Sequence, residues 1–365
     1  MKVPFLDLGR QHAPLTEELD AGFRRVLRSG DFILGKEVES FEKAFAEHLG
    51  APYAAGVGSG TEALHLSLRA LGIGPGDEVI IPSLTFAATA LAVLHAGAEP
   101  VPADVDPDTG LLDLASAAKA VTRRTRAVIP VHLYGRMLDM DALMDFAVRR
   151  HLAVIEDACQ AHGARFHGKA AGTFGRVGCF SFYPSKNLGA LGDGGLVVTS
   201  DSTLRDIIVK LRNYGQKVKY HHEGIGYNSR LDGLQAAMLR LKLKHLETWN
   251  LRRRRNARLY HRALKGLPVV LPPEPPEDSQ HVYHLFVIRS PHRDRLRDHL
   301  AKCGVGTGIH YPIPMHRMEA LSKCGRVRLP ASERFCGEVL SLPMFPELTA
   351  EEIRHVARSI ESFRP

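Results

Sequence analysis

The sequence surroundings of one lysine and one aspartate suggest that these residues are catalytic rather than solvent-exposed. Lys186 lies in the segment Phe180–Gly189, between an apolar run and the glycine-rich Gly192–Gly195. Asp157 ends the apolar run Ala153–Asp157. A lysine amine can form a Schiff base with an aldehyde, and a carboxylate can keep a pyridine nitrogen protonated so that the ring accepts electrons. This pair of residues therefore predicts chemistry that depends on pyridoxal phosphate (PLP).

Three further features are compatible with such a cofactor. Gly56–Leu64 places small residues and Thr61 before an amphipathic helix, whose free N–H groups and dipole favour a phosphate. An ordinary tight turn would use the same glycines, and no Gly-Lys-Ser/Thr of a nucleotide-binding loop follows them. Phe86 follows a predicted strand, so it either packs in the core or stacks on a flat ring. Asp157 itself either meets a ring nitrogen or accepts backbone hydrogen bonds.

Alternating strands and helices must position these residues. Strands are predicted at 78–82, 127–132, 153–157, 178–182 and 195–199, and helices at 61–71, 87–96 and 140–150. This alternation is typical of a mostly parallel central sheet with helices on both faces. Ligands bind such sheets at the carboxyl ends of the strands. Asp157 and Ser181 end their predicted strands and should therefore meet at that edge.

The pattern changes after Trp249. A basic helix to about residue 264 is followed by a proline-rich stretch at 268–276, a strand at 281–289, a helix at 293–302 and a short strand at 306–311. A last helix is predicted from Thr349, with Glu352 completing a capping box. We therefore predict a large PLP-binding domain over residues 1–248 and a smaller C-terminal α+β domain over 249–365.

The composition is typical of a soluble globular protein rather than a membrane or disulfide-rich protein. Of the 365 residues 44% are hydrophobic and 24% charged, and no apolar run approaches the roughly 20 residues that span a bilayer. The N-terminus lacks the apolar core of a secretory signal, which favours the cytoplasm. The five cysteines are odd in number and form no CxxC pair, and the adjacent His221 and His222 do not share a helix face. We therefore expect neither a disulfide framework nor a metal site.

The formal charge of +8 raises the question of an anionic partner. The cluster Arg252–Arg255 follows Leu246 and Trp249, which predicts that it lies on the solvated side of a helix. No interleaved aromatics or recognition helix indicate nucleic acid. The charge is compatible with a substrate that carries phosphate.

Five motifs in one order carry a resemblance to a known family. They are Gly-Ser-Gly-Thr-Glu-Ala-Leu at 58–64, Pro-Ser-Leu-Thr-Phe at 82–86, Glu-Asp-Ala-Cys-Gln-Ala-His-Gly-Ala at 156–164, Ser-Phe-Tyr-Pro-Ser-Lys-Asn-Leu-Gly at 181–189 and Gly-Tyr-Asn-Ser-Arg-Leu-Asp at 226–232. Together they resemble the DegT/StrS-type sugar aminotransferases, PLP enzymes of the aspartate aminotransferase fold (fold type I). The resemblance runs over nearly the whole chain. Relatives that act as dehydratases carry histidine where this chain has Lys186.

The resemblance implies a role for each motif residue. Lys186 resembles the Schiff-base lysine and proton shuttle, and Asp157 the partner of the pyridine nitrogen. Gln160 would neighbour the ring hydroxyl, Phe86 would stack on the ring, and Gly60, Thr61 and Ser181 would hold the phosphate. Asn228 matches an asparagine that reaches the phosphate in the neighbouring subunit. A homodimer with shared active sites is therefore implied.

The resemblance also implies a substrate. The segments 188–195 and 219–223 are similar to the branch that acts on 3-keto sugars, and Tyr183, His310 and Tyr311 match residues near the sugar. The implied reaction moves an amino group from L-glutamate to C3 of a nucleotide-linked keto-6-deoxyhexose, with dTDP as the expected nucleotide. Alternatives are transfer at C4, a UDP or GDP sugar, and a regulatory or nucleic-acid-binding protein that has kept the fold. The presence of Lys186 and Asp157 argues against the last.

Overall fold

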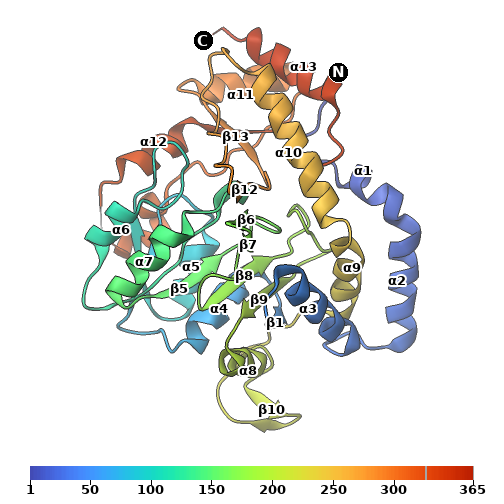
Figure 1. The fold of residues 1–365 in the computed structure, drawn as a ribbon, viewed down its shortest axis with the longest axis vertical. Helices are drawn as coiled ribbons and strands as arrows, with labels where there is room; N and C mark the ends of the chain where they lie inside the picture. The colour runs from blue at the N-terminus through green and yellow to red at the C-terminus, as the bar shows by residue number, and fades with distance from the viewer. Residues whose placement is uncertain (325–326, 365) are drawn as a thin grey trace.

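A seven-stranded sheet forms the centre of the computed structural model, which describes residues 1–324 and 327–364 (Figure 1). Its order is β1-β9-β8-β5-β4-β2-β3. The strands are β1 (Tyr53–Val57), β2 (Glu78–Pro82), β3 (Glu99–Ala103), β4 (Thr125–Val128), β5 (Ala153–Asp157), β8 (Val177–Ser181) and β9 (Gly195–Thr199). Only β9 runs antiparallel to its neighbours among these strands. The prediction of a mostly parallel sheet is confirmed.

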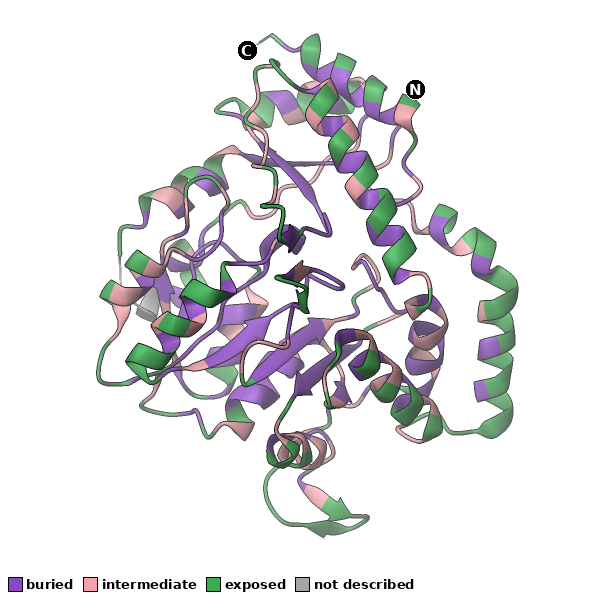
Figure 2. Cartoon of the chain, in the orientation of Figure 1, coloured by how far each residue is buried: buried purple, intermediate pink, exposed green. Residues whose placement is uncertain are grey.

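Helices cover both faces of this sheet because successive strand residues point to opposite sides. Ile80 of β2 packs in one cluster with Phe41 and Phe45 of α3 (Lys36–Leu49), a cluster that also includes α7 (Met140–Arg150). Val79 and Ile81 pack in a second cluster with α4 (Gly60–Ala70), α5 (Ala88–His95) and α8 (Ser202–Leu211). The strands are accordingly buried along almost their whole length (Figure 2).

Most predicted boundaries of the large domain agree with the structure to within one residue, with one clear exception. The strand predicted at 127–132 is instead Thr125–Val128. Pro130 lies inside the predicted range. Proline has no N–H with which to continue the ladder, so the strand ends before it, and beyond it only Val131 forms an isolated bridge with Asp157.

The C-terminal part contains its own hydrophobic core. Its elements are α10 (Leu246–Ala263), β13 (Phe286–Arg289), α11 (Arg293–Lys302), α12 (Pro330–Glu338), β14 (Val339–Leu342) and α13 (Ala350–Glu361), and β13 pairs antiparallel with β14. This core also takes in Val3 from the N-terminus. The capping box of Thr349 and Glu352 is confirmed. The domain boundary at 248/249 falls inside α10 and stays a prediction.

Two strand predictions in this part were wrong. The strand predicted at 281–289 is present only as β13, because Tyr283 has a positive φ of 44°, which an extended strand excludes. The segment 306–311 forms no strand. Its N–H groups at Gly306 and Gly308 bond to different segments, at Val3 and Ser341, so no ladder develops.

The arginine cluster was also predicted incorrectly at one position. Arg252 and Arg255 are exposed, but Arg253 is buried. Its guanidinium donates to the carbonyl oxygens of Tyr283, His284 and Met344 at 3.2, 3.3 and 3.0 Å. Arg253 therefore ties α10 to the C-terminal core instead of facing solvent.

The remaining elements lie around these two parts. They are α1 (Leu8–His12), η1 (Ala13–Leu15), α2 (Thr16–Ser29), α6 (Leu114–Ala120), η2 (Leu133–Gly135), β6 (Arg165–Phe166), β7 (Lys169–Ala170), β10 (Gln216–Val218), β11 (His221–His222), α9 (Gly233–Leu243), β12 (Ser279–Gln280), η3 (Met315–Arg317) and η4 (Glu319–Cys324). The β10–β11 hairpin projects from the body of the molecule (Figure 1).

The described residues contain no helix that is long and apolar enough to cross a bilayer. Cys159, Cys179, Cys303 and Cys336 are free thiols, and the side chain of Cys324 lies outside the described part. Within residues 1–324 and 327–364 no cluster of histidine, cysteine and carboxylate side chains is arranged for a metal ion.

Candidate active site

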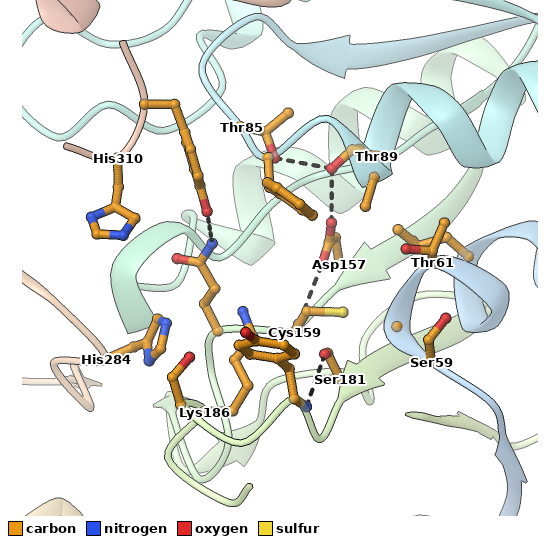
Figure 3. Close-up of a pocket in the computed structure, with 18 of the residues that line it drawn as sticks. Ser59, Thr61, Thr85, Thr89, Asp157, Cys159, Ser181, Lys186, His284 and His310 are labelled. Atoms are coloured by element: carbon orange, nitrogen blue, oxygen red, sulfur yellow. Dashed lines mark hydrogen bonds between the residues drawn. The ribbon is translucent and has the colours of Figure 1, made fainter. Parts of the chain in front are cut away.

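A cavity of about 410 Å³ opens where β5 and β8 end and α4 begins (Figure 3). β5 and β8 are paired in parallel with Asp157 opposite Cys179, so their carboxyl ends meet, as expected for a ligand site in such a sheet. All the predicted site residues except Asn228 line this cavity: Gly60, Thr61, Phe86, Asp157, Gln160, Ser181, Tyr183, Lys186, His310 and Tyr311.

One end of the cavity is suited to an anion. Ser59 caps α4 by accepting a hydrogen bond from the Glu62 N–H at 3.2 Å, which leaves the N–H groups of Gly60 and Thr61 without acceptors inside the helix. A Cβ atom at Gly60 would lie 2.6 Å from the Ser181 Cβ. Glycine is therefore needed here so that the Ser181 hydroxyl can lie beside the helix N-terminus. We call Ser59, Gly60, Thr61 and Ser181 the phosphate cup.

Asp157 is a buried carboxylate without a cationic partner. It is 6% exposed. One carboxylate oxygen accepts from the Thr89 hydroxyl at 3.0 Å and the other from the Cys159 N–H at 3.2 Å. These neutral donors are its partners among the described residues, and burial of a charge without a counter-charge is costly. A protonated ring nitrogen bound in the cavity would supply that charge, so Asp157 fits the cofactor.

Lys186 lines the same cavity and is partly exposed to it. Desolvation lowers the pKa of its ammonium group, while the charges of Cys159 and Asp157 act in the opposite direction. A lowered pKa favours the neutral amine, which is the nucleophilic form. The backbone N–H of Lys186 donates to the Tyr183 carbonyl at 2.9 Å, which shapes the loop that presents the amine.

The other end of the cavity is lined by histidine and aromatic side chains. His284 and His310 lie on one side of the cavity, and Ser59 and Thr61 lie on the other (Figure 3). His310 Nδ1 lies 2.8 Å from the Ser341 hydroxyl, and burial lowers the pKa of His310 to about 4. The His310 imidazole is therefore uncharged near neutral pH.

Phe86 and Gln160 lie between the two ends. Phe86 is 55% exposed and its ring centre lies 5.7 Å from that of Tyr311, so it is a wall of the cavity and not a core residue. Gln160 accepts from the Tyr134 N–H at 2.8 Å and donates to the Tyr311 hydroxyl at 3.2 Å. These bonds hold the amide in one orientation at the cavity wall.

Comparison with known proteins identifies the family of the chain. The model of the DegT/DnrJ/EryC1/StrS aminotransferase family matches residues 14–361. The chain belongs to this family.

Similar proteins cover the chain almost completely. A transaminase of Streptomyces venezuelae named for dTDP-3-amino-3,4,6-trideoxy-α-D-glucose is 48% identical over 364 residues, which is 99% of this chain and 96% of the relative. The crystal structure of S. venezuelae DesV with a ketimine intermediate has a TM-score of 0.96 at 49% identity and covers 99% of this chain and 98% of its own. The structure of NtdA from Bacillus subtilis with its bound cofactor PMP has a TM-score of 0.90 at 36% identity, with coverages of 98% and 84%.

Sequence reasoning did not identify several residues of this aminotransferase site. The hydroxyl groups of Thr85 and Thr89 lie 2.9 Å apart, and the Thr89 hydroxyl donates to Asp157. The sequence signal that could have identified these threonines was their four-residue spacing around Phe86. Cys159 also lines the cavity and lies within the motif at 156–164. His284 had only one signal, a histidine within a mostly apolar segment.

Asn228 is the one predicted site residue outside the cavity. It is exposed and forms an isolated bridge with Asn213, at the base of the β10–β11 hairpin. Within one copy of this aminotransferase it therefore does not meet the phosphate cup.

Proposed function

We propose that this chain is a PLP-dependent aminotransferase that moves the amino group of L-glutamate to the C3 keto group of a dTDP-linked keto-6-deoxyhexose. The observation that carries the proposal is the buried Asp157, which lacks a counter-charge and shares one cavity with the partly exposed Lys186. Family membership supports the reaction class. The similarity to the S. venezuelae transaminase supports the nucleotide and the position of the amine.

Different residues along the cavity would have different roles in the reaction. The phosphate cup would hold the cofactor phosphate, Asp157 the ring nitrogen, and Phe86 a face of the ring. When bound, PLP stores the amino group and accepts electrons from the reacting carbon. Lys186 is placed to take a proton from the amino donor and to return one to the sugar carbon. Phe86 and Tyr311 form walls of the cavity in which these transfers would take place.

A second copy of the chain would complete the site. Lys186 is the only lysine or arginine that lines the cavity among the described residues, whereas a phosphate and the two carboxylates of glutamate together bring several negative charges. Asn228 is exposed and outside its own cavity. Phe23 and Leu27 of α2 are 45% and 58% exposed, which suits an interface. We infer that Asn228 of each copy reaches the phosphate bound by the other.

Subunit mixing tests this arrangement. Lys186→Ala and Asn228→Ala, each impaired alone, should recover activity when mixed under conditions of subunit exchange, because one site of each mixed dimer then has both residues. With random exchange we expect roughly a quarter of the wild-type activity per subunit. The matched control is a mixture of Lys186→Ala with Asp157→Asn, which should stay inactive because both residues serve the same chain's site. No recovery in proven mixed dimers would contradict shared sites.

A panel of nucleotide keto-sugars tests the reaction. The purified protein should show the visible absorption of a bound cofactor at roughly 410–420 nm, and glutamate should bleach it. Subsequent addition of a dTDP-linked 3-keto sugar should restore the band and yield an amino sugar by mass spectrometry. The same assay with 4-keto sugars and with UDP and GDP sugars distinguishes the alternatives. A protein that binds no cofactor and converts no member of the panel would contradict the proposal.

A further inference from the structure

His284 is a buried side chain at the cavity for which the proposed chemistry gives no role. It lies in the irregular segment that precedes β13, it is 8% exposed, and it lines the cavity on the side opposite Ser59 and Thr61 (Figure 3). Arg253 donates to its backbone carbonyl at 3.3 Å. The residue is therefore held at the cavity wall by a buried contact.

A chain of amide hydrogen bonds determines which ring nitrogen of His284 carries the proton. The Asn250 Nδ2 donates to the carbonyl oxygen of His162 at 2.8 Å, so the Asn250 Oδ1 is the acceptor for the Asn187 Nδ2 at 2.8 Å. The Asn187 Nδ2 also donates to the Val282 carbonyl at 3.0 Å. Backbone carbonyls can only accept, so the orientation of both amides is fixed.

The fixed orientation of the Asn187 amide determines the tautomer of the His284 imidazole. Because its amide nitrogen faces two acceptors, Asn187 presents its Oδ1 to the His284 Nδ1 at 3.2 Å. Oδ1 can only accept, so Nδ1 of His284 must carry a hydrogen and donate it. Burial lowers the pKa of His284 well below its ordinary value, and the Lys186 charge lowers it further. The ring is neutral, with its single proton on Nδ1 and a lone pair on Nε2.

The Nε2 lone pair has no donor among the residues that the structure describes. Nδ1 is turned toward buried Asn187, so Nε2 is the ring nitrogen left for the cavity. A neutral acceptor repels the oxygens of carboxylates and phosphates but accepts from a hydroxyl group. Only a donor can pair with this lone pair, so a hydroxyl-bearing ligand matches this position and an anionic one does not.

We propose that His284 is a specificity-determining residue whose Nε2 accepts a hydrogen bond from a hydroxyl group next to the keto carbon of the sugar. This assignment rests on the proposed function, because it assumes a keto-sugar in this end of the cavity. The amino donor glutamate has no hydroxyl group, so His284 distinguishes the two substrates of the enzyme.

Two substitutions separate the two nitrogens of the ring. His284→Asn keeps an N–H near the position of Nδ1 for Asn187 and removes the acceptor at Nε2. His284→Gln reaches the Nε2 position with an amide oxygen and gives up the bond to Asn187. For His284→Asn we expect weaker calorimetric binding of the hydroxylated nucleotide sugar and a higher KM for it, each by roughly tenfold. His284→Gln should retain most of the affinity.

Two comparisons serve as internal controls. A sugar analogue without the hydroxyl group should bind wild type and His284→Asn equally, and KM for glutamate should not change. Equal weakening for both sugars, or a fall in kcat with unchanged sugar binding, would overturn the assignment. Lack of any nucleotide-sugar turnover by the wild-type enzyme would instead overturn the proposed function. Thermal unfolding of both variants identifies losses that come from the fold alone.

Discussion

Replacement of Lys186 by alanine should reduce glutamate-dependent turnover by at least roughly 10⁴-fold. Proton transfer by a positioned side chain supplies up to about that factor, and the variant also loses the nucleophile that anchors the cofactor aldehyde. The phosphate cup, Asp157 and Phe86 remain, so the variant should still bind cofactor, with an altered visible spectrum. Single-turnover assays with the loaded variant measure the loss directly.

A buried lysine elsewhere in the chain provides the control for this experiment. Lys242 is 1% exposed, and its ammonium donates to the Gly189 carbonyl at 2.5 Å and lies 3.0 Å from His12. Lys242→Met should lower the unfolding temperature, because a backbone acceptor loses its donor, but should not change the cofactor spectrum. Turnover near the wild-type rate in Lys186→Ala would end the aminotransferase assignment.

Replacement of Asp157 by asparagine should lower the rate by several orders of magnitude and leave the fold intact. The amide has the same shape, and the Thr89 hydroxyl can accept as well as donate, so the local hydrogen bonds can rearrange. The amide lacks the charge that keeps the ring nitrogen protonated, so the electron sink is weakened. Steady-state kcat and the cofactor spectrum check this result. A loss below about tenfold, roughly 1.4 kcal/mol of barrier, would make Asp157 structural.

For the adjacent carboxylate, Glu156, we expect a substitution to affect the stability of the fold more than the rate. Glu156 is fully buried and accepts from the N–H groups of Gly172, Phe174 and Gly175 at 2.8, 2.6 and 2.7 Å. Its side chain also meets His132 Nε2 at 3.0 Å. Glu156→Gln should therefore destabilise the fold by about 1–3 kcal/mol and change the rate less than Asp157→Asn does. Denaturant unfolding and kinetics of both variants test this contrast between neighbours.

The sequence alone determined the parts that depend on local pattern. Short segments centred on Val, Ile or Leu predicted β2, β5 and β9 with the observed bounds, because strands that are buried on both faces are rich in such residues. The rule that ligands bind at carboxyl strand ends then placed Asp157 and Ser181 at one edge. Lys186 was recognisable because a lysine between apolar and glycine-rich segments is seldom solvated.

Only the tertiary structure decided the features that depend on distant partners. Arg253 is buried because the carbonyls of Tyr283, His284 and Met344 surround it, and these residues follow it by 30, 31 and 91 positions. The direction of the amide chain behind His284 likewise depends on Asn187 and Asn250, which are 63 residues apart. A hydrogen bond needs a geometry that periodicity does not encode when its partners are far apart in the chain. The local sequence pattern therefore identified the reactive groups. Tertiary packing determined their orientation and the neighbours that influence their charge.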